Sequence, residues 1–247
     1  NPADGDLEYI LDADGTYEII AGEPTWEGQN LEQCQALIDD IGLSAFLIES
    51  QHNVEDTKGG IYEHIEFQHC DWADVPPLER IVVWVDPAVT NTDDSDAHGI
   101  QADGVACGKL YRLFSWEGRT SPEESLTRAI QKAVELKAEC VGVETDQGGD
   151  TWASTYQQAA QKANIPNPPN FRSAKAGAGH GPKAHRQSQM LAAYERGEII
   201  HVRGTHTVLE RALRRFGVRK PYDLADAGYW SWYDLCGRRR RWLPVGD

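Results

Sequence analysis

The chain has 247 residues, of which 40% are hydrophobic and 26% are charged, and its mean hydropathy is -0.56. This composition excludes a collagen or a disordered tail, and no stretch approaches the roughly 18 apolar residues of a membrane-spanning helix. The net charge of -15 is unevenly divided, because residues 1–150 carry -24 and residues 151–247 carry +9. This asymmetry indicates either a polyanion partner for the basic half or two solvated faces of opposite sign.

The first 79 residues differ in pattern from the rest. A short strand is expected at 17–20 and an amphipathic helix at 29–41. The paired prolines within residues 74–77 indicate a boundary, because proline stops regular structure. We therefore expect a small N-terminal linker segment at residues 1–79 and a main domain at residues 80–247.

From residue 80 onwards the chain alternates between strand and helix patterns. The β-branched run at 81–85 is typical of a buried central strand, and Ser121, Pro122 and Glu124 form the start signal of a helix. Strands are expected at 81–85, 98–107, 109–116, 140–143, 170–173 and 199–202. Helices are expected at 121–136, 150–163, 183–196, 205–215 and 222–235. Three successive strands followed by helix–strand alternation predict an α/β domain with a mixed β-sheet flanked by helices.

Acidic residues stand where the buried strands end. Asp86 directly follows one strand and Glu144 directly follows another. Side chains at these positions point into the crevice where ligands bind, and a carboxylate there needs a cation to stay ionised. Asp223 and Asp226, spaced i, i+3 at a helix start, share one helix face. These oxygen ligands predict a Mg²⁺ or Mn²⁺ site, although a lone strand-end aspartate can also cap the following turn.

Three further patterns are weaker signals. The glycine-rich run 177–183 lacks the GxxxxGK[ST] pattern, so we expect no ATP binding by this chain. His64, His69 and Cys70 have no second Cys/His pair at zinc-ligand spacing, and we interpret them as surface residues. The arginines at 238–241 could meet phosphate, but a charged chain end is the commoner explanation.

Four motifs resemble, in order and spacing, the nuclease domain of tailed-phage terminase large subunits. They are IVVWVDPA at 81–88, GVETDQGGD at 142–150, YERGEIIH at 194–201 and DLADA at 223–227. The resemblance implies an RNase H-like fold and a two-metal nuclease whose ligands are Asp86, Glu144 and Asp223 with Asp226. Which of the last two binds metal directly stays open. Residues 17–60 are similar to the end of that family's ATPase region.

The resemblance implies an endonuclease of a viral DNA-packaging motor that cuts concatemeric double-stranded DNA at the start and end of packaging. Two Mg²⁺ or Mn²⁺ ions roughly 3.5–4 Å apart can activate water, anchor the scissile phosphate and neutralise the leaving oxygen. Asp86 is expected to bridge both ions, with Glu144 holding one and Asp223 or Asp226 the other. The implied partners are double-stranded DNA, the portal protein, the small terminase subunit and the ATPase domain of the full-length protein. No membrane contact is expected, and the implied location is the host cytoplasm during virus assembly.

The basic half is expected to hold the DNA backbone without reading its sequence. The expected contacts are Lys175, Lys183, Arg186, Arg211, Arg214, Arg215, Arg219 and Lys220. These cations can instead pair with the acids of residues 1–150 and hold the two halves together. Two other functions stay open: another RNase H-like nuclease such as a junction resolvase, and a non-catalytic DNA-binding or portal-binding module.

Overall fold

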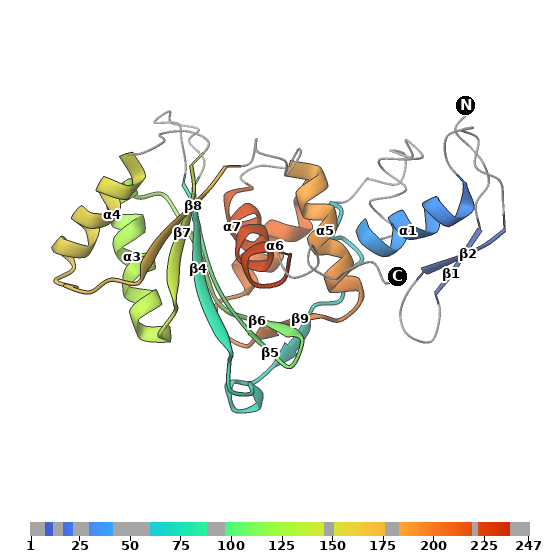
Figure 1. Cartoon of the computed structure of the whole chain (residues 1–247), viewed down its shortest axis with the longest axis horizontal. Coiled ribbons are helices and arrows are strands. Elements are labelled where there is room, and N and C mark those ends of the chain that lie inside the picture. Colours follow the sequence, from blue (N-terminus) through green and yellow to red (C-terminus); the bar gives the residue numbers. More distant parts are fainter. Residues whose placement is uncertain are drawn as a thin grey trace, which may run out of the picture.

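The fold centres on a seven-stranded mixed β-sheet with helices on both faces (Figure 1). The strand order is β3-β9-β6-β5-β4-β7-β8. The computed structural model describes residues 8–11, 17–21, 30–41, 60–87, 97–145, 151–175, 183–218 and 222–237. Within these residues, no helix has both the length and the apolar character needed to cross a membrane.

The strands pair antiparallel in the middle of the sheet and parallel towards its edges. They are β3 (Gln68–Cys70), β4 (Arg80–Asp86), β5 (His98–Ala106), β6 (Lys109–Gly118), β7 (Cys140–Glu144), β8 (Asn170–Ala174) and β9 (Ile199–Val202). Strands β4, β5 and β6 form an antiparallel meander, with β7 and β8 parallel to β4. On the other side β9 is parallel to β6, and β3 is parallel to β9. Because helices cover both faces of the sheet, the run of β4 is buried from Val82 onwards, as the sequence predicts.

Two groups of helices cover the two faces of the sheet (Figure 1). One consists of α3 (Pro122–Leu136) and α4 (Thr151–Lys162). The other consists of α5 (Lys183–Glu195), α6 (Thr207–Arg214) and α7 (Asp223–Trp232), and a π-helical turn at Tyr233–Gly237 continues α7. Side chains alternate along β4 as strand geometry requires: Val83 and Val85 join the core under α3 and α4, and Val82 and Trp84 join the core under α7. The start signal predicted for α3 is confirmed as a capping box at its N-terminus.

The N-terminal elements form a small separate sheet and one helix. Strand β1 (Glu8–Leu11) pairs antiparallel with β2 (Tyr17–Ala21), and α1 (Leu31–Ile41) contacts β2 and α5. Gln35 Oε1 accepts a 2.8 Å hydrogen bond from the Ile19 amide, which ties α1 to β2. The expected strand and helix of this region are confirmed, whereas the sequence did not predict β1.

Residues 60–79 pack onto the domain that we expected to begin at residue 80. Strand β3 extends the main sheet, and Tyr62 and Phe67 are buried in the core under α5 and α6. The Tyr62 hydroxyl donates a 2.8 Å hydrogen bond to the main-chain oxygen of Gln187 in α5. Residues 60–79, which we call the leader, therefore belong to the same folded unit as the sheet. Their assignment to the end of an ATPase region stays a prediction.

Candidate active site

The structure brings the four predicted carboxylates together at one edge of the sheet. Asp86 is the last residue of β4 and Glu144 is the last residue of β7. The two strands are parallel neighbours, with Val85 beside Val143, so their carboxyl ends coincide. Asp223 and Asp226 lie in the first turn of α7, which packs against β4 and β5. All four side chains are buried.

Gly99 explains how α7 comes close enough to the sheet. It lies opposite Asp86 in the β4–β5 register. A Cβ atom on Gly99 would lie 2.4 Å from the Leu224 amide nitrogen and 2.5 Å from the Asp223 carbonyl carbon. Any side chain at this position would push the first turn of α7 away from Asp86. The sequence analysis did not identify Gly99, because its role depends on a helix more than 120 residues later.

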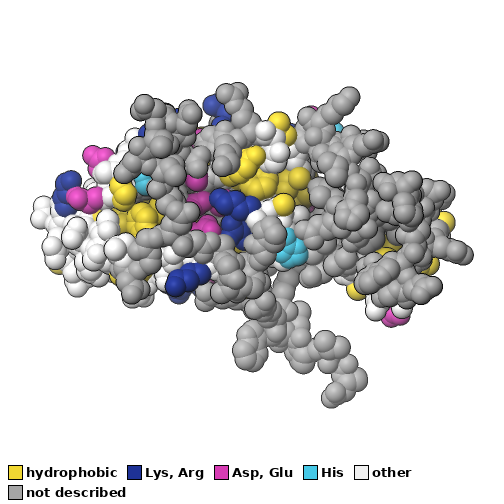
Figure 2. Space-filling view, turned by 90° about the horizontal axis from the view of Figure 1, so that it is seen from above, with side chains coloured by type: hydrophobic (Ala, Val, Ile, Leu, Met, Phe, Trp, Pro, Cys, Tyr) yellow, Lys and Arg dark blue, Asp and Glu magenta, His cyan; other side chains and the backbone are white. Residues whose placement is uncertain are grey.

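Two cations from α5 lie among the carboxylates. Lys183 Nζ forms an ion pair with Asp226 Oδ2 and lies 3.9 Å from Asp86 Oδ2. Arg186 Nη1 donates to Glu144 Oε1 at 3.2 Å, and its Nη2 lies 3.7 Å from Asp226 Oδ1. Although burial lowers the pKa of Lys183, the Asp226 and Asp86 carboxylates raise it well above its usual range. Figure 2 shows acidic side chains beside Lys and Arg side chains near the middle of the face seen from above.

Glu144 is oriented by a tryptophan that the sequence analysis missed. The indole Nε1 of Trp230 donates a 2.7 Å hydrogen bond to Glu144 Oε2. Trp230 stacks on Trp84 at 5.8 Å between ring centroids, and Trp84 Nε1 donates to Asp234 Oδ2 at 3.2 Å. Gly142 leaves room for the Trp84 indole, since a Cβ there would lie 2.3 Å from the ring. Both oxygens of Glu144 therefore have fixed donors, one from Arg186 and one from Trp230.

Burial makes Asp86 and Glu144 difficult to ionise. Burial raises the pKa of Asp86 well above its usual value, and the nearby Glu144 and Asp226 carboxylates raise it further, opposed by Lys183. Burial also raises the pKa of Glu144, and Arg186 and the Trp230 hydrogen bond oppose that rise.

The donor set fits a hard divalent cation. The four carboxylates and the two cations Lys183 and Arg186 give the cluster a formal net charge of about -2 when all groups are ionised. Among the described residues, Asp86 Oδ2 is buried and has no hydrogen-bond partner. Carboxylate oxygens are the ligands that Mg²⁺ and Mn²⁺ prefer.

The predicted DNA contacts separate into different environments. Lys175 is exposed and follows Ala174, which lies beside Glu144 in the β7–β8 register. Arg211 is exposed on α6. Lys183 and Arg186 were expected on a DNA surface, but Arg186 is only 1% exposed and both contact the carboxylates.

The remaining predicted DNA contacts join parts of the fold or fall outside the described residues. Arg214 donates to the main-chain oxygens of Glu63 and Ile65 in the leader, at 2.7 and 3.1 Å. Arg215 pairs with Glu117 of β6 at 2.9 Å. Arg215 thus pairs with an acid of residues 1–150, as in the alternative, whereas the acceptors of Arg214 are main-chain oxygens. Arg219 and Lys220 lie outside the described residues.

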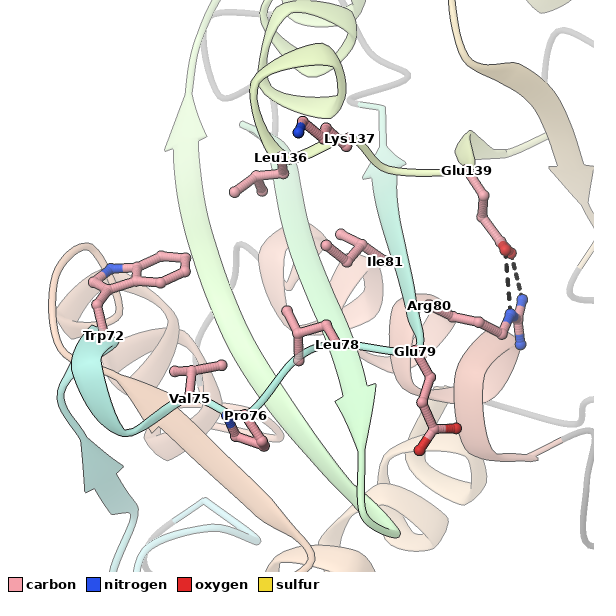
Figure 3. Close-up of a pocket in the computed structure, with 10 residues that line it drawn as sticks. All are labelled: Trp72, Val75, Pro76, Leu78, Glu79, Arg80, Ile81, Leu136, Lys137 and Glu139. Atoms are coloured by element: carbon pink, nitrogen blue, oxygen red, sulfur yellow. Dashed lines mark hydrogen bonds and ion pairs between the residues drawn. The ribbon is translucent and has the colours of Figure 1, made fainter.

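A cavity of about 480 Å³ lies away from the carboxylates, between the leader and the end of α3 (Figure 3). Trp72 and Leu78 line it from one side and Leu136 from the other. Arg80 and Glu139 form an ion pair at its margin. Its lining mixes apolar side chains with charged ones, and none of the four predicted carboxylates is among its lining residues.

Comparison with known proteins identifies a family. The profile of the terminase RNaseH-like domain matches residues 83–229. No curated protein sequence matches the chain. The large terminase of the thermophilic bacteriophage D6E has a TM-score of 0.52 at 12% identity, over 83% of this chain and 53% of that chain. This chain therefore spans about half the length of the D6E protein.

Two nuclease domains are also among the similar structures. The terminase nuclease domain of human cytomegalovirus has a TM-score of 0.47 at 13% identity, over 65% of this chain and 86% of that chain. The nuclease domain of the large terminase subunit gp2 of bacterial virus Sf6 has a TM-score of 0.43 at 12% identity, over 64% and 90%.

The family match extends over more than half of the chain and includes all four carboxylates of the cluster. The mixed sheet flanked by helices confirms the RNase H-like α/β fold expected from the motifs. The chain belongs to the family of terminase RNaseH-like domains.

Proposed function

We propose that this domain is a divalent-metal-dependent endonuclease that cuts double-stranded DNA at the start and end of viral genome packaging. The observation that carries the proposal is the meeting of Asp86, Glu144, Asp223 and Asp226 at the carboxyl ends of two parallel strands. Family membership supports the reaction class. The fold alone would not, because one fold hosts many functions.

The chain's own residues divide the work at this site. Asp86, Glu144 and the α7 aspartates would hold two Mg²⁺ or Mn²⁺ ions, which supply Lewis acidity and lower the pKa of bound water when present. Trp230 keeps Glu144 in one orientation. The Glu144 side chain therefore does not have to become ordered when a cation binds. Lys183 and Arg186 offset part of the negative charge in the metal-free protein.

DNA would be held through its backbone, beside the cluster. Lys175 is exposed and directly follows Ala174, the residue beside Glu144 in the β7–β8 register, which supports a DNA contact there. Arg211 is a second exposed cation. Contacts of this kind neutralise phosphates and carry no sequence information, which suits a weakly sequence-specific nuclease. The portal protein, the small terminase subunit and an ATPase domain are the partners we propose, in the host cytoplasm during virus assembly.

The test is cleavage of linear duplex DNA by the purified domain with Mg²⁺, with Mn²⁺ and with EDTA. We expect cutting with either metal, none in EDTA, and none by Asp86→Ala with either metal. Asp74→Asn, which changes an exposed acid away from the cluster, is the matched control and should cut normally. A four-way junction tested in parallel separates the two nuclease classes, since preferential cutting of the junction indicates a resolvase. Absence of metal-dependent cutting on both substrates would leave a binding module.

A further inference from the structure

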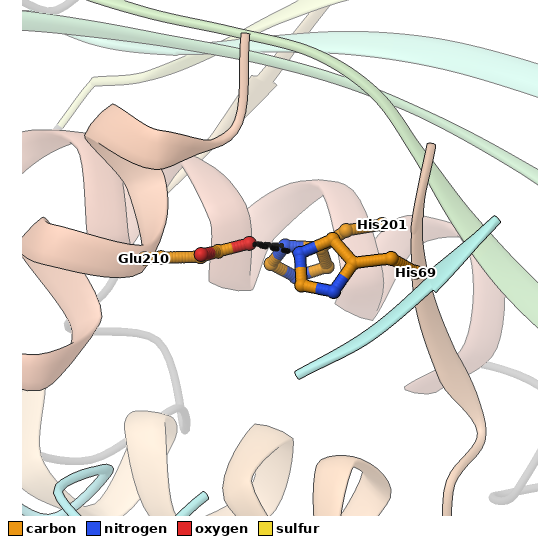
Figure 4. Close-up of side chains that lie close together, drawn as sticks. All are labelled: His69, His201 and Glu210. Atoms are coloured by element: carbon orange, nitrogen blue, oxygen red, sulfur yellow. Dashed lines mark hydrogen bonds and ion pairs between the residues drawn. The ribbon is translucent and has the colours of Figure 1, made fainter. Parts of the chain in front are cut away.

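Three polar side chains that the carboxylate cluster does not use meet near the β3 edge of the sheet (Figure 4). His69 comes from β3, His201 from β9 and Glu210 from α6. His69 Nε2 and His201 Nδ1 lie 2.7 and 2.8 Å from the same atom, Glu210 Oε1. One potential ligand atom from each residue lies within 4.8 Å of the other two. Strand β9 is three strand positions from β4, about 14 Å, so this trio is separate from the carboxylate cluster.

We propose that His69, His201 and Glu210 form a binding site for Zn²⁺ or a closely related divalent transition-metal ion. Two imidazole nitrogens and one carboxylate oxygen suit Zn²⁺ and closely related transition metals, whereas Mg²⁺ prefers oxygen ligands. Three protein ligands leave a fourth tetrahedral position for water. The side chains of His69 and Glu210 are 37% and 23% exposed, which gives an ion and its water a route to the site.

The two contacts with Glu210 need only a small adjustment to hold such an ion. Zinc lies about 2.0–2.2 Å from nitrogen and oxygen ligands, and tetrahedral angles then place the ligand atoms about 3.4 Å apart. Both nitrogen–oxygen separations must therefore increase by about 0.6–0.7 Å. His69 stands on a three-residue edge strand and Glu210 is partly exposed, so these two side chains can supply the movement.

His201 is the fixed member of the site. It is fully buried, and Phe67 stacks on its ring with centroids 5.0 Å apart. Its Nε2 is 2.9 Å from the Tyr194 hydroxyl, the kind of contact through which proteins orient a metal-bound histidine. The ionised Glu210 carboxylate can only accept, so in the metal-free protein the imidazole hydrogen of His201 is on Nδ1 and the Tyr194 hydroxyl donates to Nε2. An ion at Nδ1 requires that hydrogen to move to Nε2, which moderates the affinity.

Two of the three groups are already in the ionisation state that a metal requires. Burial lowers the pKa of His201 to about 4, so its imidazole is neutral at pH 7. Although burial raises the pKa of Glu210, hydrogen bonds from His201 and His69 lower it to about 2, so its carboxylate is ionised. A neutral imidazole and an ionised carboxylate are the forms that coordinate metal.

The consequence is a connection between the leader and the rest of the domain. Strand β3 belongs to the leader and pairs with β9 over only three residues. An ion shared by β3, β9 and α6 would fasten this short edge strand at its middle residue. Because an ion that binds only the folded state stabilises it, Zn²⁺ should raise the melting temperature.

The test is titration of the metal-free domain with zinc chloride in excess Mg²⁺, which is added to fill the proposed Mg²⁺ site at the carboxylate cluster. Isothermal titration calorimetry gives the stoichiometry, and a parallel thermal melt gives the shift in melting temperature. The variants are His69→Ala, which alters an exposed side chain, and Glu210→Gln, which keeps the shape and removes the charge. His64→Ala, at an exposed histidine of the same leader, is the matched control.

We expect wild type and His64→Ala to bind one more equivalent of Zn²⁺ than His69→Ala and Glu210→Gln, and only the first two to gain melting temperature. Cobalt chloride should give the visible absorption of a tetrahedral site in the same two proteins. Zinc binding by His69→Ala equal to that of wild type would overturn the proposal, as would a wild type that takes up no extra equivalent. The trio would then be a hydrogen-bonded cluster only.

Discussion

Removal of the Lys183 ammonium should tighten metal binding at the carboxylate cluster. Lys183 Nζ contacts Asp226 and lies 3.9 Å from Asp86 Oδ2, so a cation shared by these carboxylates competes with it. At about 4 Å the interaction of two unit charges is worth about 4 kcal/mol at an effective dielectric constant of about 20, and about 1 kcal/mol in water. The side chain is 47% exposed, which places the effect near the lower figure. We expect a gain of about 1–2 kcal/mol, equivalent to a 5-fold to 30-fold lower dissociation constant.

The assay is Mn²⁺ titration of Lys183→Met, which keeps most of the aliphatic side chain and removes the charge. Calorimetry or the electron paramagnetic resonance signal of free Mn²⁺ gives the dissociation constant. The control is Lys162→Met, because Lys162 pairs with Glu123 on the α3–α4 face, away from the cluster. In EDTA the Lys183→Met variant should also unfold more easily than wild type, because Asp226 loses a partner. Unchanged or weaker Mn²⁺ binding would show that Lys183 does not occupy the place of a metal ion, and would refute the reasoning.

Three further outcomes follow from contacts at and near the site. In EDTA, Asp86→Asn should be more stable than wild type at pH 7, and this advantage should shrink as the pH falls towards 4. Because the pKa of Asp86 is raised in the folded state, folded wild type binds a proton more tightly than the unfolded chain does. The stability of wild type therefore falls as the pH rises from the unfolded pKa to the folded pKa of Asp86. Urea titrations at several pH values measure this dependence. Trp230→Phe removes the donor of Glu144 Oε2, so it should cost about 1–3 kcal/mol of stability and weaken Mn²⁺ binding. Urea midpoints and Mn²⁺ affinities equal to those of wild type would contradict this. Lys175→Ala should weaken binding to duplexes of any sequence and reduce the slope of log K against log salt by roughly 0.9, whereas Arg214→Ala should lower the melting temperature and leave the slope unchanged.

The sequence predicted those parts of the fold that depend on local pattern. The β-branched run of β4 and the capping box of α3 are complete within a few residues, and both elements form where expected. Strand β3 was missed because it has three residues and no apolar alternation. What defines it is the neighbouring strand β9, more than 130 residues later. Pairing at that separation leaves no periodicity in the sequence of β3.

The sequence predicted the site residues that lie at strand ends. It did not predict the orientation of the residues that helix packing brings to the site. Asp86 and Glu144 follow buried strands, which alone places them at one edge of the sheet. Lys183 and Arg186 were assigned to the DNA surface from the net charge of their half of the chain. Net charge does not show which way a side chain points. Their i, i+3 spacing, the same that links Asp223 to Asp226, places both on one face of α5 and could have indicated a shared target.

The leader matters for the site, because its contacts reach a proposed metal ligand through one residue. Tyr62 donates to the main-chain oxygen of Gln187. The side-chain Nε2 of the same Gln187 donates to Asp226 Oδ1 at 3.3 Å and to the Ala225 main-chain oxygen at 2.9 Å. The position of α5 against the leader therefore also determines the orientation of Asp226. A domain trimmed to begin at the proline boundary would keep every carboxylate of the cluster but lose this support. The leader is thus part of what positions Asp226.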